Sequence, residues 1–249
     1  MDNPPTVSPR EDYGIDAPGV VRANLIFGLA ACALAAGMLL QAAIPFGEWG
    51  PTLLVILLFI GLSLILTAGI MVHGSRVAKL RLRDRLLAQL PFRGDERLLD
   101  VGCGRGLLLV GAARRLPEGC ATGLDIWRGA DQSGNTPARA RSNARAAGVS
   151  ERIDLATGDA RAMPYPAAAF DIVTSSWAIH NLPTRESRQQ AVRECLRVLR
   201  PGGWLAIADI ARIEEYAEAL ETAGVRQIAR SRPYFVFAIP TVILIARKP

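Results

Sequence analysis

The stretch Leu98-Leu-Asp-Val-Gly-Cys-Gly-Arg-Gly106 joins a short apolar run to three closely spaced glycines, and the apolar segment Leu107–Leu116 follows directly. A strand, a glycine-rich turn and a helix in this order form a ligand site at the carboxyl edge of a parallel sheet. Glycines suit such a turn because a side chain would hold the backbone away from the ligand. The stretch therefore predicts an α/β domain that binds a ligand at this turn.

The spacing of the glycines separates two classes of ligand. A dinucleotide-binding turn has the pattern G-x-G-x-x-G, which requires a glycine at position 107, where this chain has leucine. Asp100 lies two residues before the first glycine. Its carboxylate would repel a pyrophosphate but attract the ammonium group of a methionine moiety. The pattern thus favours S-adenosylmethionine over NAD.

Strand and helix candidates alternate along the rest of the chain. Short apolar runs predict strands at Leu98–Val101, Ala121–Ile126, Ile153–Thr157, Asp171–Ser175 and Trp204–Asp209. Helices are expected at Leu107–Leu116, from the N-cap Thr136 to the stop at Gly148, at Arg185–Leu199 and at Ile213–Ala223. The apolar tail Tyr234–Ala246 is too short to cross a bilayer and is expected to form two strands joined near Pro240. This alternation predicts an α/β fold with a doubly wound, mostly parallel sheet.

Two further acidic residues follow predicted strands. Asp125 ends the second strand, where a carboxylate can accept hydrogen bonds from both ribose hydroxyls. Asp159 follows the third strand, where it can accept a hydrogen bond from the adenine amino group, while Ala160 leaves room for the ring. Each acid alone would indicate only a turn or a helix cap. Together with Asp100, they place three carboxylates along one sheet edge.

Residues from about 93 to 248 resemble a class I S-adenosylmethionine-dependent methyltransferase domain. The matching stretches are LLDVGCGRG, GLDI, GDARAMPYP, FDIVTSSWAIHNL and CLRVLRPGGWLAIADI. The resemblance implies a seven-stranded, Rossmann-like sheet whose last strand is antiparallel. It also implies that Gly102 and Gly104 approach the donor, that Asp125 holds the ribose, and that Asp159 and Ala160 flank the adenine. The other cofactor contacts expected along these stretches are Cys103, Gly106, Ile126 and Ser175.

The segment Ser175–Leu182 follows the fourth predicted strand, where the family lines its methyl-transfer pocket. His180 could take a proton from the acceptor, or it could be a packed histidine that orients the loop through a hydrogen bond. Because the sulfonium donor is already activated, alignment of the nucleophile, methyl group and sulfur can supply much of the catalysis. Trp177 could wall the pocket or simply pack, and Asn181 is a second candidate for contact with the acceptor.

Two uncharged stretches, Ala23–Phe46 and Trp49–Val72, precede the predicted domain. Each exceeds the ~20 residues that a helix needs to cross the hydrocarbon of a bilayer. A signal peptide has a shorter apolar core and would not explain the second stretch. The short connection makes the two helices antiparallel, so a transmembrane helical hairpin is expected.

Basic residues flank the expected hairpin on both sides. Arg10 and Arg22 precede it, and a cluster opposed only by Asp84 follows it, namely Arg76, Lys79, Arg81, Arg83 and Arg85. Such a pattern places both termini and the catalytic domain on the cytoplasmic side of a cell (inner) membrane, near anionic lipid headgroups. The predicted organisation is a disordered tail over 1–22, two transmembrane helices over 23–73, an amphipathic basic connector helix over 74–92 and the methyltransferase domain over 93–249. The connector could lie on the membrane or pack on the domain.

The composition limits the kinds of partner and binding site that are expected. The formal charge is +6, but no basic patch is interleaved with aromatic residues, so no nucleic acid partner is expected. The four cysteines lack metal-ligand spacing, so neither a metal site nor a disulfide framework is expected. The expected partners are the lipid bilayer and a small-molecule or lipid-like acceptor, with no obligate protein partner. The leading hypothesis is a membrane-anchored methyltransferase, and the alternative is a non-catalytic membrane adaptor that retains the fold.

Overall fold

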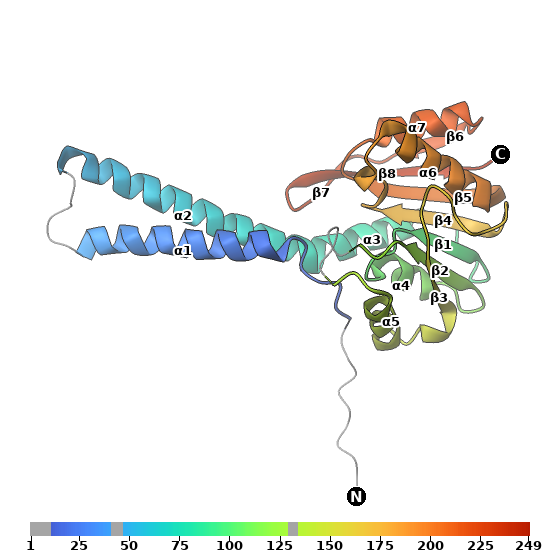
Figure 1. Cartoon of the computed structure of the whole chain (residues 1–249), viewed down its shortest axis with the longest axis horizontal. Coiled ribbons are helices and arrows are strands. Elements are labelled where there is room, and N and C mark those ends of the chain that lie inside the picture. The colour runs from blue at the N-terminus through green and yellow to red at the C-terminus, as the bar shows by residue number, and fades with distance from the viewer. Residues whose placement is uncertain (1–10, 41–46, 129–133) are drawn as a thin grey trace, which may run out of the picture. The chain divides into compact units, whose positions relative to one another are not determined.

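The computed structural model describes residues 11–40, 47–128 and 134–249, and the chain divides into two compact units (Figure 1). The smaller unit comprises residues 15–77. The larger unit comprises residues 78–249 together with the N-terminal residues up to Gly14. The predicted tail up to residue 10, the end of the first apolar stretch at 41–46, and positions 129–133 lie outside the described residues.

The larger unit is built on an eight-stranded sheet. Seven strands lie in the order β3-β2-β1-β4-β5-β8-β6, and the short β7 pairs with β8. Their bounds are β1 (Arg97–Val101), β2 (Cys120–Asp125), β3 (Ile153–Thr157), β4 (Phe170–Ser176), β5 (Leu199–Asp209), β6 (Gln227–Arg230), β7 (Tyr234–Val236) and β8 (Ile239–Arg247). Strands β1 to β5 pair in parallel, and β8 is antiparallel to β5, β6 and β7. The mostly parallel sheet with an antiparallel last strand is confirmed, with one strand more than the expected seven.

The C-terminal tail turns earlier than the sequence suggested. The two residues between β7 and β8, Phe237 and Ala238, have φ values of +56° and +62°. Left-handed conformations at both central residues are typical of a tight hairpin turn. Pro240 lies inside β8 instead of at the turn, opposite Phe235. Proline is tolerated there because β8 pairs only with β7 at this position.

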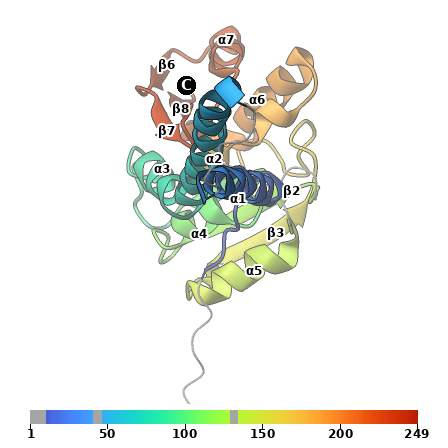
Figure 2. The same ribbon diagram turned by 90° about the vertical axis from the view of Figure 1, so that its left-hand side faces the viewer.

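Helices cover both faces of the sheet. Figure 2 shows α4 (Leu107–Ala113) and α5 (Pro137–Ala146) on one side, and α6 (Arg185–Val198) and α7 (Ile213–Thr222) on the other. The start of α5 is as predicted, because the Thr136 side chain caps it by accepting a hydrogen bond from the Arg139 amide. This arrangement confirms the doubly wound α/β architecture.

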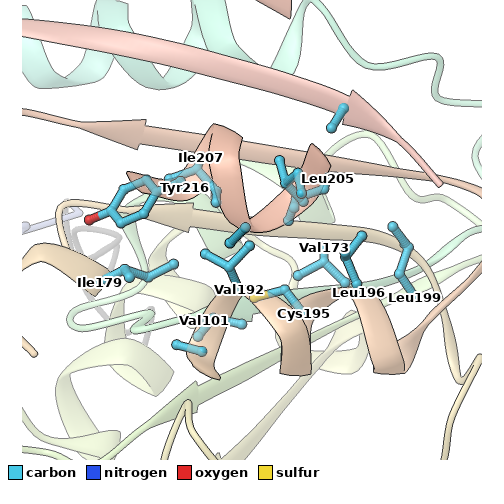
Figure 3. Close-up of a cluster of buried hydrophobic side chains, with 14 of the residues drawn as sticks. Val101, Val173, Ile179, Val192, Cys195, Leu196, Leu199, Leu205, Ile207 and Tyr216 are labelled. Atoms are coloured by element: carbon cyan, nitrogen blue, oxygen red, sulfur yellow. The ribbon is translucent and has the colours of Figure 1, made fainter. Parts of the chain in front are cut away.

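A hydrophobic cluster lies on each face of the sheet. Figure 3 shows the cluster under α6 and α7, filled by side chains of β1, β4, β5 and both helices. The opposite cluster joins α4 to the connector helix α3 (Lys79–Leu87) through Leu82, Leu86 and Leu87. Because helices cover both faces, the central strands β1 and β4 are largely buried, and a ligand site is expected at the carboxyl ends of the strands.

The apolar side of the connector packs on the domain, which is one of the two expected arrangements. A π-helical turn, Gly74–Ala78, joins it to the preceding helix, and α3 itself ends at Leu87 instead of continuing to residue 92. Its apolar face is buried against α4, while Arg81 and Arg85 stay exposed.

The expected disordered tail over residues 1–22 is wrong for the part that the structure describes. Residues 11–14 belong to the larger unit, and the first helix already begins at Pro18. Tyr13 is buried in the same cluster as α3 and α4. The Lys79 Nζ donates hydrogen bonds to the carbonyls of Tyr13 (2.9 Å) and Gly14 (3.0 Å). These contacts order a polar segment that has no periodicity of its own, and we refer to residues 11–14 as the N-terminal strap.

The smaller unit consists mainly of two helices, α1 (Pro18–Leu40) and α2 (Gly50–His73). They approach closely where Gly61 meets Cys32, since a Cβ at position 61 would lie 2.5 Å from the cysteine sulfur. Both helices are long and apolar enough to cross a membrane. Large apolar side chains remain exposed along both, including Phe27 and Phe59.

Candidate functional site

The glycine turn after β1 adopts a conformation that side chains disfavour. Gly102 has a φ of +72°, and a Cβ there would lie 2.2 Å from the Ala178 Cβ. The amides of Gly102 and Cys103 both donate to the Leu124 carbonyl, at 2.7 and 3.2 Å. Gly106 then begins α4 in the left-handed region. The turn is therefore held between the end of β2 and the loop after β4.

Asp125 ends β2 and organises the segments around the turn. One carboxylate oxygen accepts from the Gly104 amide at 2.8 Å, and the other accepts from the Trp127 amide at 2.7 Å and the Asn135 side chain at 3.2 Å. A carboxylate offers about four lone-pair sites, so capacity for a further hydroxyl donor remains. The neighbouring Ile126 is exposed.

Asp100 lies on β1, two residues before the turn, and is only 1% exposed. Its Oδ1 accepts from the Thr174 hydroxyl at 3.0 Å, whereas its Oδ2 is buried without a hydrogen-bond partner among the described residues. Burial raises the pKa of Asp100 to about 7. A buried carboxylate oxygen without a partner is costly, and a cationic group placed beside it would remove that cost.

We expect Asp100→Asn to stabilise the protein without ligand more at about pH 8 than at about pH 5. In the unfolded chain, the Asp100 carboxyl has its ordinary pKa of 3.8 and loses its proton as the pH rises above that value. In the folded domain the pKa is raised, so Asp100 keeps its proton to a higher pH. The wild-type free energy of unfolding should therefore fall as the pH approaches 7 and level off above it, whereas asparagine removes this titration. Thermal unfolding in detergent across this range measures the difference, and parallel pH profiles for the two proteins would contradict it.

The third predicted acid follows β3 and faces solvent. Asp159 is bound by Arg161, whose Nε and Nη2 lie 3.0 and 2.5 Å from its two carboxylate oxygens. This hydrogen-bonded guanidinium lowers the pKa of Asp159. The contact with Arg161 was not predicted from the sequence, although Arg161 lies only two residues from Asp159. Because the ion pair is solvent-exposed, another donor can compete for the carboxylate.

Residues at the end of β4 and in the loop after it have different roles. Ser175, predicted to contact the cofactor, is buried and donates its hydroxyl to the Val101 carbonyl at 2.9 Å, so it ties β4 to β1. Trp177 has a φ of +52°, and its ring packs against Phe237 with centroids 5.5 Å apart. The Asn181 amide group donates to the Trp177 carbonyl at 3.3 Å. Trp177 therefore packs, and it also lines a cavity between α3 and the end of β4.

His180 is oriented by a buried acid that the sequence analysis missed. Its Nδ1 lies 2.5 Å from Oδ1 of Asp209, the last residue of β5. The Tyr216 hydroxyl donates to the other carboxylate oxygen at 3.0 Å, and Figure 3 shows this hydroxyl pointing out of the apolar cluster. The His180 Nε2 makes no hydrogen bond with any described residue. The hydrogen bond that orients the loop is thus present, and it leaves one ring nitrogen available. The signal for Asp209 was an acid at the carboxyl end of a strand, as for Asp125.

The N-terminal strap lies against the glycine turn. Asp12 binds the Arg105 guanidinium at 3.3 Å, and the Asn143 side chain donates to the carbonyls of Asp12 (3.0 Å) and Arg105 (2.8 Å). Arg105 is buried by this contact. The strap therefore fixes the outer side of the turn from a position 90 or more residues away in sequence.

Among the described residues, no group of three or more histidine, cysteine, aspartate or glutamate side chains could hold a metal ion. The described cysteines are free thiols. The site thus consists of the glycine turn, the carboxylates of Asp100, Asp125 and Asp159 at successive strand ends, and the His180–Asp209 pair at the far side.

Comparisons with known proteins agree with this geometry. Residues 99–207 match the family described as a methyltransferase domain. The chain is 37% identical over 153 residues to a 27-O-demethylrifamycin SV methyltransferase of Amycolatopsis mediterranei, covering 59% of this chain and 53% of the relative. It is 34% identical over 131 residues to a ubiquinone/menaquinone biosynthesis C-methyltransferase of Roseobacter denitrificans, covering 53% and 49%. The chain thus spans about half the length of these curated relatives.

Solved structures share the fold. The cyclase SpnF superimposes with a TM-score of 0.57 at 25% identity, covering 70% of this chain and 82% of that one. An S-adenosylmethionine-dependent methyltransferase from Aquifex aeolicus gives a TM-score of 0.55 at 19% identity, covering 74% and 98%. Over residues 99–207 the chain is thus similar to the methyltransferase-domain family, and S-adenosylmethionine is the cofactor that this similarity implies.

Proposed function

We propose that the protein is a membrane-anchored methyltransferase that transfers a methyl group from S-adenosylmethionine to a small-molecule or lipid-like acceptor. The observation that carries the proposal is the carboxyl edge of the sheet. There a glycine turn in the left-handed region lies beside two neighbouring strands, which carry a buried carboxylate oxygen of Asp100 and the carboxylate of Asp125. This combination suits one ligand that carries both an ammonium group and a ribose.

Each part of the edge would hold a different part of the cofactor. The Asp100 carboxylate would accept a hydrogen bond from the ammonium group, and the Asp125 carboxylate would accept hydrogen bonds from the ribose hydroxyls. Asp159 and Ala160 would flank the adenine. Arg161 would give up at least one of its contacts with Asp159 for this. When bound, S-adenosylmethionine supplies a methyl group already activated by its sulfonium, so the chain must mainly align the acceptor.

His180 would act on the acceptor side as a general base. Asp209 holds the Nδ1 side of the ring at 2.5 Å, which leaves Nε2 to take a proton from an acceptor hydroxyl. The buried Asp209 carboxylate would stabilise the imidazolium that forms, and Tyr216 holds that carboxylate in place. Trp177 would border the acceptor at the end of β4.

The acceptor class is supported by two kinds of observation. One relative is named as a methyltransferase of 27-O-demethylrifamycin SV and another as a C-methyltransferase of ubiquinone/menaquinone biosynthesis, and these names point to small-molecule acceptors. The two apolar helices favour an acceptor that partitions into a membrane. The basic residues on both flanks of the hairpin support cytoplasmic termini in a cell (inner) membrane.

Isothermal titration calorimetry tests the cofactor site. We expect the full chain to bind S-adenosylmethionine and not NAD. Asp125→Ala should weaken binding by roughly 10- to 100-fold, because a hydrogen bond to a charged group contributes about 1.5–3 kcal/mol and ~1.4 kcal/mol is tenfold in affinity. Asp154→Ala is the matched control, since Asp154 is an exposed acid on β3. Binding of NAD in place of S-adenosylmethionine would refute the proposal.

Transfer itself must be measured separately, because a solved neighbour with this fold is a cyclase. A membrane extract incubated with methyl-labelled S-adenosylmethionine should gain label with the wild-type protein and lose it with an Asp125→Ala, Asp159→Ala protein. Cofactor binding without any label transfer would favour the non-catalytic adaptor. Label that persists in the double variant would exclude this domain as its source.

A further inference from the structure

The hairpin formed by β7 and β8 exposes apolar side chains at its tip. Phe235 is 70% exposed and Ile239 is 42% exposed. Among the described residues of the larger unit, the only other large apolar side chain with comparable exposure is Ile126, at the cofactor edge. Ile239 pairs with Val236 and Phe235 pairs with Pro240, so the two side chains lie on opposite faces of the hairpin. Single exposed apolar residues are ordinary, but here the tip of one hairpin exposes an apolar side chain on each face.

The hairpin contacts the basic helix α3. The Arg85 guanidinium lies 4.7 Å from the centre of the Tyr234 ring. Arg81 on α3 and Arg232 before β7 are also exposed. The single acid on α3, Asp84, is bound by the Arg83 Nε at 2.8 Å. Cations therefore lie on α3, which contacts the hairpin through Tyr234, and directly before β7.

The C-terminal sequence adds to this charge imbalance. Residues 223–249 contain no aspartate or glutamate, and they carry five basic residues, namely Arg226, Arg230, Arg232, Arg247 and Lys248. Arg230 pairs with Glu214, and Arg247 ends β8 far from the hairpin tip, so Arg232 is the cation next to the hairpin. Apolar aromatic groups surrounded by cations are typical of surfaces that enter the headgroup region of anionic bilayers. A protein partner that carried both acids and an apolar pocket would also fit, but chain connectivity favours lipid. Only the five residues Gly74–Ala78 separate α3 from the apolar helix α2.

We propose that α3 and the β7–β8 hairpin form a docking surface for anionic lipid headgroups, with Phe235 and Ile239 inserted at the bilayer interface. The proposal rests on the membrane anchor of the proposed function. It adds that the domain itself rests on the membrane, instead of being merely tethered to it.

The position of this surface links it to the acceptor end of the site. Phe237, on the turn of the same hairpin, packs on Trp177 at the end of β4. Both aromatic residues are held at positive φ, at +56° and +52°. Strained backbone at bulky residues is concentrated at functional sites. A lipid-soluble acceptor that enters at the docking surface would therefore meet these two rings first.

A fluorescent label tests the insertion of the hairpin. The full chain carrying Phe235→Cys, with Cys32→Ala and Cys120→Ala, is labelled with an environment-sensitive dye and reconstituted into nanodiscs. Burial raises the pKa of the Cys195 thiol to about 12 and that of Cys103 well above its usual range, so these two thiols stay unreactive at neutral pH. Discs contain phosphatidylcholine alone or phosphatidylcholine mixed with phosphatidylglycerol.

We expect the label at position 235 to shift to the blue and to be quenched by doxyl lipids, and both effects should be larger with phosphatidylglycerol. A label at Glu151→Cys, an exposed position before β3, should show neither effect. Arg81→Glu should reduce the dependence on phosphatidylglycerol, whereas Arg141→Glu, an equal charge change on the exposed side of α5, should not. A solvent-like emission at position 235 in both kinds of disc would overturn the proposal.

Failure of the anchor would be seen in a different measurement. If the chain does not enter nanodiscs or float with vesicles at all, then the two-helix anchor is wrong. If it floats but the label at position 235 behaves like the label at position 151, then only the docking surface is wrong.

Discussion

Gly102→Ala should reduce S-adenosylmethionine affinity by more than about 100-fold. The variant combines two penalties. The φ of +72° costs a non-glycine residue on the order of 1–3 kcal/mol. The added Cβ would also lie 2.2 Å from the Ala178 Cβ, so the turn or the loop after β4 must move. Because this turn also carries the Gly104 amide that Asp125 binds, its displacement disturbs the proposed ribose contact as well. Calorimetry with the full chain measures the loss.

A matched substitution separates strain from collision. Gly148 has a similar φ of +69°, but a Cβ there meets nothing within 4 Å. Gly148→Ala should therefore lower the melting temperature through backbone strain and leave the cofactor affinity unchanged. If Gly102→Ala bound S-adenosylmethionine as tightly as the wild type, then the turn would not be the cofactor cradle.

His180→Ala should lower kcat by about 10²- to 10⁴-fold, the usual contribution of a general base, without changing cofactor affinity. The reason is that His180 lies at the acceptor end of the sheet edge and is oriented by Asp209 rather than by the glycine turn. Asp209→Asn should lower kcat by a smaller factor, since it retains the ring but alters its orientation and the stabilisation of its charged form. Rates of label transfer, with cofactor titrations on the same samples, give both numbers.

The opposite outcome has a clear meaning. If His180→Ala transfers label at the wild-type rate and only melts at a lower temperature, then the histidine packs and orients the loop. Methyl transfer would then depend on alignment alone, as the activated sulfonium allows.

Local signals in the sequence were sufficient for one half of the site. The turn at Gly102–Gly106 and the acid Asp125 could be predicted because a strand, a glycine turn and a helix are consecutive in the chain. The start of α5 at Thr136 followed in the same way from capping chemistry. These features depend on a few neighbouring residues, so the sequence alone specifies them.

The other half depends on contacts between distant segments. Asp209 meets His180 only because β5 pairs beside β4, and no local pattern reports that a side chain at one strand end reaches the next loop. The strap was missed for the same reason, since Asp12 is ordered by Arg105 and Asn143. Ser175 depends on such a contact too, because its hydroxyl is turned into the sheet and donates to the Val101 carbonyl on β1.

The hydrogen bonds of Lys79 suggest how residues 15–77 could be replaced by a short linker. Its Nζ reaches the carbonyls of Tyr13 and Gly14, so the chain leaves the domain at Gly14 and re-enters it at Ala78 within one side chain's reach. A few residues, at ~3.5 Å each, could bridge that gap. Replacing residues 15–77 by a short glycine-containing linker would therefore remove both apolar helices and keep the strap against the glycine turn.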